Sequence, residues 1–263
     1  MMRVEIVNSL SEYIELVNSI YEEGYIFYRG QNSHKEHKLL PSLLRIDPHS
    51  ENRIYSDNCD QNFINTFKAR GLPHLKYIPK NEWEWMSTAQ HYGLPTRLLD
   101  WSQGPLAALF FATENTSFRN TEDDCSVVWC LNPTVLNEKS RFIEDFTSIP
   151  NLSEENETFL QQLKEKFGVG VNHNGQLYPI ALIHPSSNTR IHAQRGVFTL
   201  FPINGLPLDE LEKSDEFLIK ILIPNELKPD FKKQLFSTGI TYSNIYPDLD
   251  SLCKDIKFEY NFK

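Results

Sequence analysis

The chain has 263 residues, enough to bury a substantial core in one large domain, and its 40% hydrophobic and 12% aromatic content is typical of an ordered globular protein. Its formal net charge of −9 argues against a general nucleic-acid-binding surface, which needs a basic balance, but allows a local basic groove. The four cysteines lack the spacing of zinc ligands, so we expect free thiols and no bound metal. No apolar run reaches the ~20 residues of a membrane span, so we expect no membrane partner and a cytoplasmic location.

The N-terminal third is predicted to be a helix, a short strand and a mostly helical stretch. Leu10, Ile14 and Val17 recur at helical spacing, and Gly24 follows as a stop signal. The apolar run that comes next, residues 25–30, is typical of a short buried strand. Residues 39–80 are predicted to be mostly helical, with an amphipathic segment near their middle.

The middle of the chain alternates helices and strands. Residues 83–92 are predicted to form a helix that ends at Gly93, and residues 97–101 a strand. Pro105 fits the first turn of the apolar helix that follows. Residues 125–131 are rich in β-branched and aromatic side chains, which predicts a buried strand.

The second half begins with a polar, charged stretch at residues 134–175, which we interpret as an insertion of helices and loops within one domain. Three further strands and a closing amphipathic helix are predicted at residues 178–183, 196–201, 217–223 and 249–256. This irregular order predicts an α+β fold, a single domain over residues 1–263 with a central mixed or antiparallel sheet flanked by helices.

The densest group of polar side chains is the run QHYGLPTRLLDWS at residues 90–102. A stretch that only packs does not need so many different polar groups, so the run indicates a site. His91 could act as an acid or base or bind a ligand, or it could be a satisfied core residue. Arg97 and Asp100 could form a structural ion pair instead of touching a ligand.

Two arginine-containing segments outside this run are also candidates. Arg29 ends the first strand, where its planar guanidinium could hold a phosphate, with Gly30 letting the backbone turn and approach the ligand. Alternatively, Arg29 pairs with a core carboxylate such as that of Asp100. Gln194 could bind an amide or a ribose hydroxyl but cannot be a general base, and the neighbouring Arg190 would add positive potential.

Four blocks in this order resemble the FRG domain, a family named for its Phe/Tyr-Arg-Gly motif. The blocks are residues 27–31, 90–112, 190–198 and 239–252. The family is widespread in bacteria and often encoded near mobile-element and phage-defence genes. The resemblance therefore implies a bacterial effector of a phage-defence or toxin-type system.

The chain also resembles the ADP-ribosyltransferase fold. The resemblance rests on the order of a strand that carries Arg29, a strand that carries the hydroxyl of Ser102, an Ala/Phe-rich helix and a late strand. It implies NAD as the cofactor, with Arg29, His91 and Gln194 as the catalytic candidates. The cofactor-binding candidates are Tyr28, Arg29, Gly30, Gln31, Thr96, Arg97 and Ser102. Gln194 stands where the transferases carry a glutamate, which departs from their pattern.

Three functions are therefore compatible with the sequence. The first is an NAD-binding ADP-ribosyltransferase or NAD glycohydrolase. The second is a non-catalytic module that senses a nucleotide or a protein, and the third is a metal-independent nuclease built on His91, Arg29 and Arg97. No P-loop, GxGxxG, HExxH or nucleophile-elbow pattern adds a further class. The partners expected are a nucleotide or NAD and, for some of these functions, a nucleic-acid or protein target.

Overall fold

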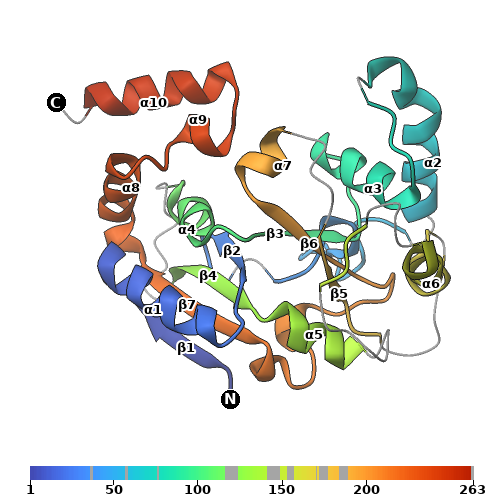
Figure 1. The fold of residues 1–263 in the computed structure, drawn as a ribbon, viewed down its shortest axis with the longest axis horizontal. Coiled ribbons are helices and arrows are strands. Elements are labelled where there is room, and N and C mark those ends of the chain that lie inside the picture. Colours follow the sequence, from blue (N-terminus) through green and yellow to red (C-terminus); the bar gives the residue numbers. More distant parts are fainter. Residues whose placement is uncertain are drawn as a thin grey trace.

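The fold is built on one seven-stranded sheet with helices packed around it (Figure 1). The computed structural model describes residues 1–35, 38–56, 59–75, 77–115, 124–140, 149–152, 157–169, 171, 177–183 and 189–261. The strands are β1 (Arg3–Ile6), β2 (Phe27–Gln31), β3 (Leu98–Ser102), β4 (Cys125–Leu131), β5 (Ile180–Leu182), β6 (Gly196–Leu200) and β7 (Leu218–Pro224). The helices are α1 (Leu10–Glu22), α2 (Cys59–Gly71), α3 (Glu82–His91), α4 (Pro105–Thr113), α5 (Pro133–Ser140), α6 (Glu157–Phe167), α7 (Thr189–Ala193), α8 (Lys228–Ser237), α9 (Tyr242–Ile245) and α10 (Leu249–Asn261).

The strand order is β1-β7-β4-β2-β3-β6-β5. The β1–β7 pair is parallel and the other neighbouring pairs are antiparallel, so the sheet is mixed. The predicted α+β class with a mixed sheet flanked by helices is confirmed. No helix within the described ranges is both long and apolar enough to cross a membrane.

The sheet opens between the neighbouring strands β2 and β3. β2 pairs with β4 over its whole length, from Phe27 to Gln31, and β3 pairs with β6 over its whole length, from Leu98 to Ser102. Between β2 and β3 themselves, the register holds a single pair, Tyr28 with Ser102. Beyond this pair the strands diverge, and the gap leaves room for a cavity at the centre of the sheet.

Helix α4 lies directly on β2, and Gly30 makes this contact possible. A Cβ atom at position 30 would be 1.8 Å from the carbonyl oxygen of Ala108 and 2.6 Å from the amide nitrogen of Ala112, both backbone atoms of α4. The glycine is not among the residues with positive φ. The expectation that Gly30 serves a turn is therefore wrong: its missing side chain lets the helix approach the strand.

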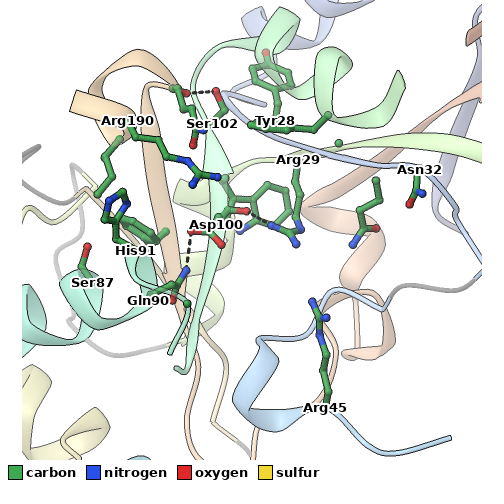
Figure 2. A pocket seen from close by; sticks show the side chains of 18 residues that line it. Tyr28, Arg29, Asn32, Arg45, Ser87, Gln90, His91, Asp100, Ser102 and Arg190 are labelled. Carbon is green, nitrogen blue, oxygen red and sulfur yellow. Dashed lines mark hydrogen bonds between the residues drawn. The ribbon is translucent and has the colours of Figure 1, made fainter. Parts of the chain in front are cut away.

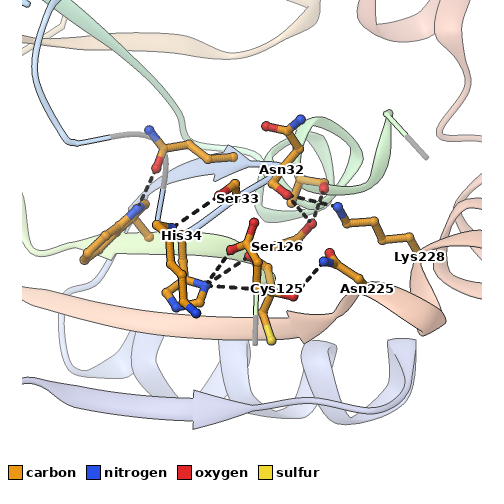
Figure 3. A network of polar contacts seen from close by, with 12 residues as sticks. Asn32, Ser33, His34, Cys125, Ser126, Asn225 and Lys228 are labelled. Carbon is orange, nitrogen blue, oxygen red and sulfur yellow. Dashed lines mark hydrogen bonds and ion pairs between the residues drawn. The ribbon is translucent and has the colours of Figure 1, made fainter. Parts of the chain in front are cut away.

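A polar network fixes the far end of β2 (Figure 3). The carbonyl oxygen of Asn32 accepts a hydrogen bond of 3.0 Å from Nζ of Lys228, a buried ammonium whose pKa is lowered by burial. Ser126 of β4 donates at 2.7 Å to the carbonyl of Ala112 in α4. The backbone amide of Cys125 donates to Nδ1 of His34 at 3.1 Å. These contacts hold β2, β4 and α4 together where the cavity begins.

Most of the predicted elements are present, with some shifted ends. The exception is residues 39–80, whose described part contains one α-helix, α2, and short 3-10 turns rather than a mostly helical stretch. The edge strand β1 and the helices α7, α8 and α9 were not predicted. Residues 134–175 include most of α5 and all of α6, but several of them lie outside the described ranges. The domain boundaries and the insertion therefore stay predictions.

Candidate functional site

A cavity of about 610 Å³ lies where β2 and β3 separate (Figure 2). Its walls come from both strands, from the end of α3, from α7 and from the loop that carries Arg45. Volumes of this size, about 300–1,000 Å³, are typical of small-molecule sites. The cavity therefore has the dimensions of a ligand site, and its polar lining decides which ligand fits.

Arg29 is at the centre of the cavity and bridges the gap between the two strands. One of its terminal nitrogens donates to the backbone carbonyl of Asp100 at 2.6 Å, while its buried Nε has no hydrogen-bond partner in the described part of the chain. Burial lowers the pKa of Arg29, the Asp100 carboxylate opposes this effect, and the positive charge of Arg45 adds to it. Among the residues that the structure describes, no carboxylate forms a direct ion pair with Arg29.

Two further arginines line the same cavity, Arg45 and Arg190. The guanidinium of Arg190 lies 4.7 Å from the centre of the Tyr246 ring, a cation–π distance. The hydroxyl of Tyr246 in turn donates to the carboxylate of Glu114 at 3.0 Å. Among the described residues that line the cavity, Asp100 has the sole carboxylate. An otherwise acidic protein therefore holds a locally cationic cavity, which favours an anionic ligand.

Polar side chains of residues 90–102 form a network of hydrogen bonds beside Arg29. The amide of Gln90 donates to the carboxylate of Asp100 at 2.6 Å, and its oxygen accepts from the hydroxyl of Thr96. His91 lines the cavity next to this chain. Burial, together with the charge of Arg190, lowers the pKa of His91, so its imidazole is neutral at pH 7.

Ser102 connects the strand gap to α7. Its hydroxyl donates to the backbone carbonyl of Gln194 at 2.6 Å and accepts from the backbone amide of Gly104 at 2.8 Å. The side-chain amide of Gln194 donates to the carbonyl of Ile245 at 3.1 Å. Gln194 therefore reaches the cavity from a fixed position, as a neutral group.

The structure brings most of the predicted site residues together. The residues that line the cavity are Tyr28, Arg29, Gly30, Gln31, His91, Ser102 and Gln194. Their roles in binding and catalysis stay predictions. Thr96 is buried behind Gln90 and does not line the cavity.

Arg97 is the main exception. Its side chain is fully buried, and its Nε lies 2.8 Å from the carboxylate of Asp60 in α2. The expected pair with Asp100 does not form, because successive side chains of a strand point to opposite faces and residues three apart do not share one. Asp100 is exposed, and it holds Arg29 through its backbone carbonyl rather than through its side chain. Arg97 is thus placed as a structural residue, outside the cavity.

Sequence reasoning missed Arg45 and Asp60. Arg45 follows a short 3-10 turn in a segment that was predicted to be mostly helical, and no local pattern marks it. Asp60 stands in the first turn of α2, where acidic residues are common and usually exposed. Only its burial against Arg97 reveals its role.

The fold and the cavity define an α+β protein with a cavity that three arginines line. Residues 24–121 match the family model of the FRG domain. The match covers β2, α2, α3, β3 and α4, includes Arg29, His91 and Ser102, and ends before Gln194. No curated protein and no solved structure matches the chain.

Proposed function

We propose that the cavity binds NAD and that the protein is an ADP-ribosyltransferase-like effector. One observation carries the proposal: Arg29, Ser102 and Gln194 line a single cavity although they are far apart in the chain. These are the three positions that the resemblance to the transferases singles out. Action in phage defence or in a toxin-type system is proposed on the FRG resemblance alone.

The charges of the cavity support a pyrophosphate-containing ligand. Three guanidinium groups face it, against one carboxylate and a neutral imidazole. A guanidinium binds phosphate oxygens through two parallel charged hydrogen bonds. Phe111 and Ile191 add apolar surface to the wall, which suits the flat rings of a dinucleotide. On this proposal Arg29 and Arg190 hold the pyrophosphate.

The reaction would break the bond between the ribose C1′ and the nicotinamide nitrogen. Nicotinamide leaves with the bonding electron pair, and a nucleophile of the acceptor bonds to C1′ and releases its proton. The positive charge that develops on the ribose needs a nearby negative charge. Gln194 has none, so we assign this role to Asp100, the sole carboxylate of the described cavity wall.

Replacing Arg29 by alanine tests the binding. A charged hydrogen bond contributes roughly 1.5–3 kcal/mol, so we expect NAD affinity by calorimetry to fall about ten- to a hundredfold or more. The melting temperature should change little, because Arg29 is only half-buried and, among the described residues, makes one hydrogen bond and no ion pair. The matched control is Arg70→Ala, which removes an exposed arginine of α2 outside the cavity.

If Arg29→Ala unfolds the protein, Arg29 is a structural brace and the binding proposal loses its main support. Millimolar NAD without a calorimetric signal from the unaltered protein would contradict the proposal directly. Incubating labelled NAD with cell lysate and the same proteins then separates the possible activities. Labelled acceptors indicate transfer, free ADP-ribose indicates hydrolysis, and unchanged NAD indicates binding alone.

Binding without catalysis is the second candidate, and Gln194 is the observation that favours it. A glutamine stands in place of the transferase glutamate, and its amide is already bonded to the carbonyl of Ile245. A module of this kind would sense the nucleotide and pass the signal to a protein partner. It predicts saturable NAD binding with no turnover in the lysate assay.

The pH dependence of binding follows from His91. In the free protein its pKa lies below the ordinary value of about 6.5, because burial and Arg190 disfavour the imidazolium. A bound anion raises that pKa, so the complex takes up a proton. NAD affinity should therefore rise as the pH falls from neutral and level off below the pKa of the free protein, by at most about tenfold per pH unit for one proton. Calorimetry across this range should show a flat profile for His91→Gln.

A further inference from the structure

A smaller cavity of about 130 Å³ adjoins the site and shares Arg29 and Arg45 with it. Its remaining walls include Ser42 and the apolar side chains of Leu98 and Leu99. One water occupies about 30 Å³ in the liquid, so a phosphate group with some of its water fits the space. The two arginines therefore face a second, separate volume beside the one assigned to the pyrophosphate.

We propose that this side cavity is a phosphate-monoester subsite, formed by Arg29 and Arg45, and that the protein prefers a 2′-phosphorylated dinucleotide, NADP, to NAD. The inference rests on the proposed function, because the rest of the dinucleotide must occupy the larger cavity.

The arrangement of the two cations supports this subsite. Arg45 lies close enough to Arg29 for its charge to lower the pKa of the Arg29 guanidinium. Two like charges held together disfavour each other, and an anion between them removes that cost. Among the described residues, the buried Nε of Arg29 is a donor without an acceptor. Buried donors without a partner are rare and indicate a missing acceptor.

Arg45 has its terminal nitrogens available for such an acceptor. Within the described residues its side chain makes one hydrogen bond, from Nε to the carbonyl of Leu40 at 3.4 Å. This contact directs the guanidinium toward Arg29 (Figure 2). The hydroxyl of Ser42, on the same turn, is a further potential donor to a phosphate oxygen.

Asp100 also borders the side cavity, and its carboxylate would repel a phosphate. The amide of Gln90 donates to that carboxylate at 2.6 Å and partly offsets its charge. Two guanidinium groups against one such carboxylate leave the side cavity with a net positive charge. Because Arg45 is exposed, water screens its contribution, and we expect a moderate preference rather than an absolute one.

The test is a calorimetric titration of NADP and NAD into the unaltered protein, Arg45→Met and Arg70→Met. We expect NADP to bind about tenfold more tightly than NAD, which is the effect of one additional charged contact. The ratio should fall to about one in Arg45→Met and stay unchanged in Arg70→Met, which removes the same charge from an exposed position of α2.

Equal affinities for NADP and NAD in the unaltered protein would overturn the subsite and leave the proposed function standing. The subsite would also be overturned if the ratio of NADP to NAD affinity fell as much in Arg70→Met as in Arg45→Met. The net charge of the protein alone would then explain the preference. If neither dinucleotide binds, the proposed function fails, and inorganic phosphate tests the subsite separately. Millimolar phosphate should broaden its ³¹P resonance with the unaltered protein but not with Arg45→Met, and no broadening with either would overturn the subsite.

Discussion

Replacing Arg97 by leucine is expected to lower the free energy of unfolding by about 3–5 kcal/mol, the cost of removing one partner of a buried ion pair. The Arg97 side chain is fully buried, and its Nε donates to Asp60 at 2.8 Å. Its terminal nitrogens donate to three backbone carbonyls, those of Phe201, Phe167 and Gly168. Arg97 thus joins the end of β6, the end of α6 and the start of α2.

Leucine would remove the cation that faces the buried Asp60 carboxylate and the Arg97 donors to three carbonyls, of which that of Gly168 still accepts from the backbone amide of Val171. Urea denaturation should measure this loss, and the double variant Arg97→Leu/Asp60→Leu should recover part of it, because the stranded charge is then gone. Arg29→Ala, with no direct ion pair to break, is the comparison from the cavity. A loss below about 1 kcal/mol in Arg97→Leu would show that the pair is not a main support of the fold.

Replacing Gly30 by alanine is expected to produce the second large loss of stability, at or above the upper end of the roughly 1–3 kcal/mol found for overpacked cores. The added Cβ would meet the carbonyl oxygen of Ala108 at 1.8 Å, and this atom belongs to the backbone of α4. No side-chain rotation relieves such a contact, so α4 must move away from β2. The cavity would change shape as well, since Gly30 and Phe111 of α4 both line it.

Gly71→Ala is the matched control for this substitution. A Cβ atom there meets nothing closer than 3.8 Å, and the backbone has helical angles, φ −78° and ψ −25°. Replacing glycine by alanine where the backbone angles suit alanine raises the free energy of unfolding by roughly 0.4–1 kcal/mol. Thermal and urea denaturation should therefore show a loss of stability for Gly30→Ala and a gain for Gly71→Ala. An unchanged stability of Gly30→Ala would mean that α4 lies farther from β2 than the structure places it.

Local sequence patterns predict most of the helices and strands and the class of fold. Hydrophobic spacing and stop signals are local, so they predicted α1, α3, α4, β3 and β4 to within a few residues. They failed over residues 39–80, where many polar and apolar side chains do not follow a regular period and the chain forms short turns that the rest of the protein holds. The lone parallel edge strand β1 was missed because its pairing with β7 depends on residues more than 200 positions away.

The residues of the candidate site could be predicted from the sequence, but their arrangement could not. Arg29, His91 and Gln194 were identifiable because polar side chains stand at the ends of apolar segments, where ligand groups are commonly placed. Their convergence depends on the order of the strands, which brings β2 beside β3 and β3 beside β6. No pattern within a single segment contains that order.

The surroundings of each arginine depend on the tertiary structure. Arg29 and Arg97 both adjoin short apolar strands, yet Arg29 faces an open cavity while Arg97 is buried against Asp60. The reason is that the role of a charged side chain depends on which groups lie within a few ångströms of it, and those groups come from distant parts of the chain. Gly30 illustrates the same point: the sequence favoured a turn, but the packing of α4 against β2 explains why the position has no side chain.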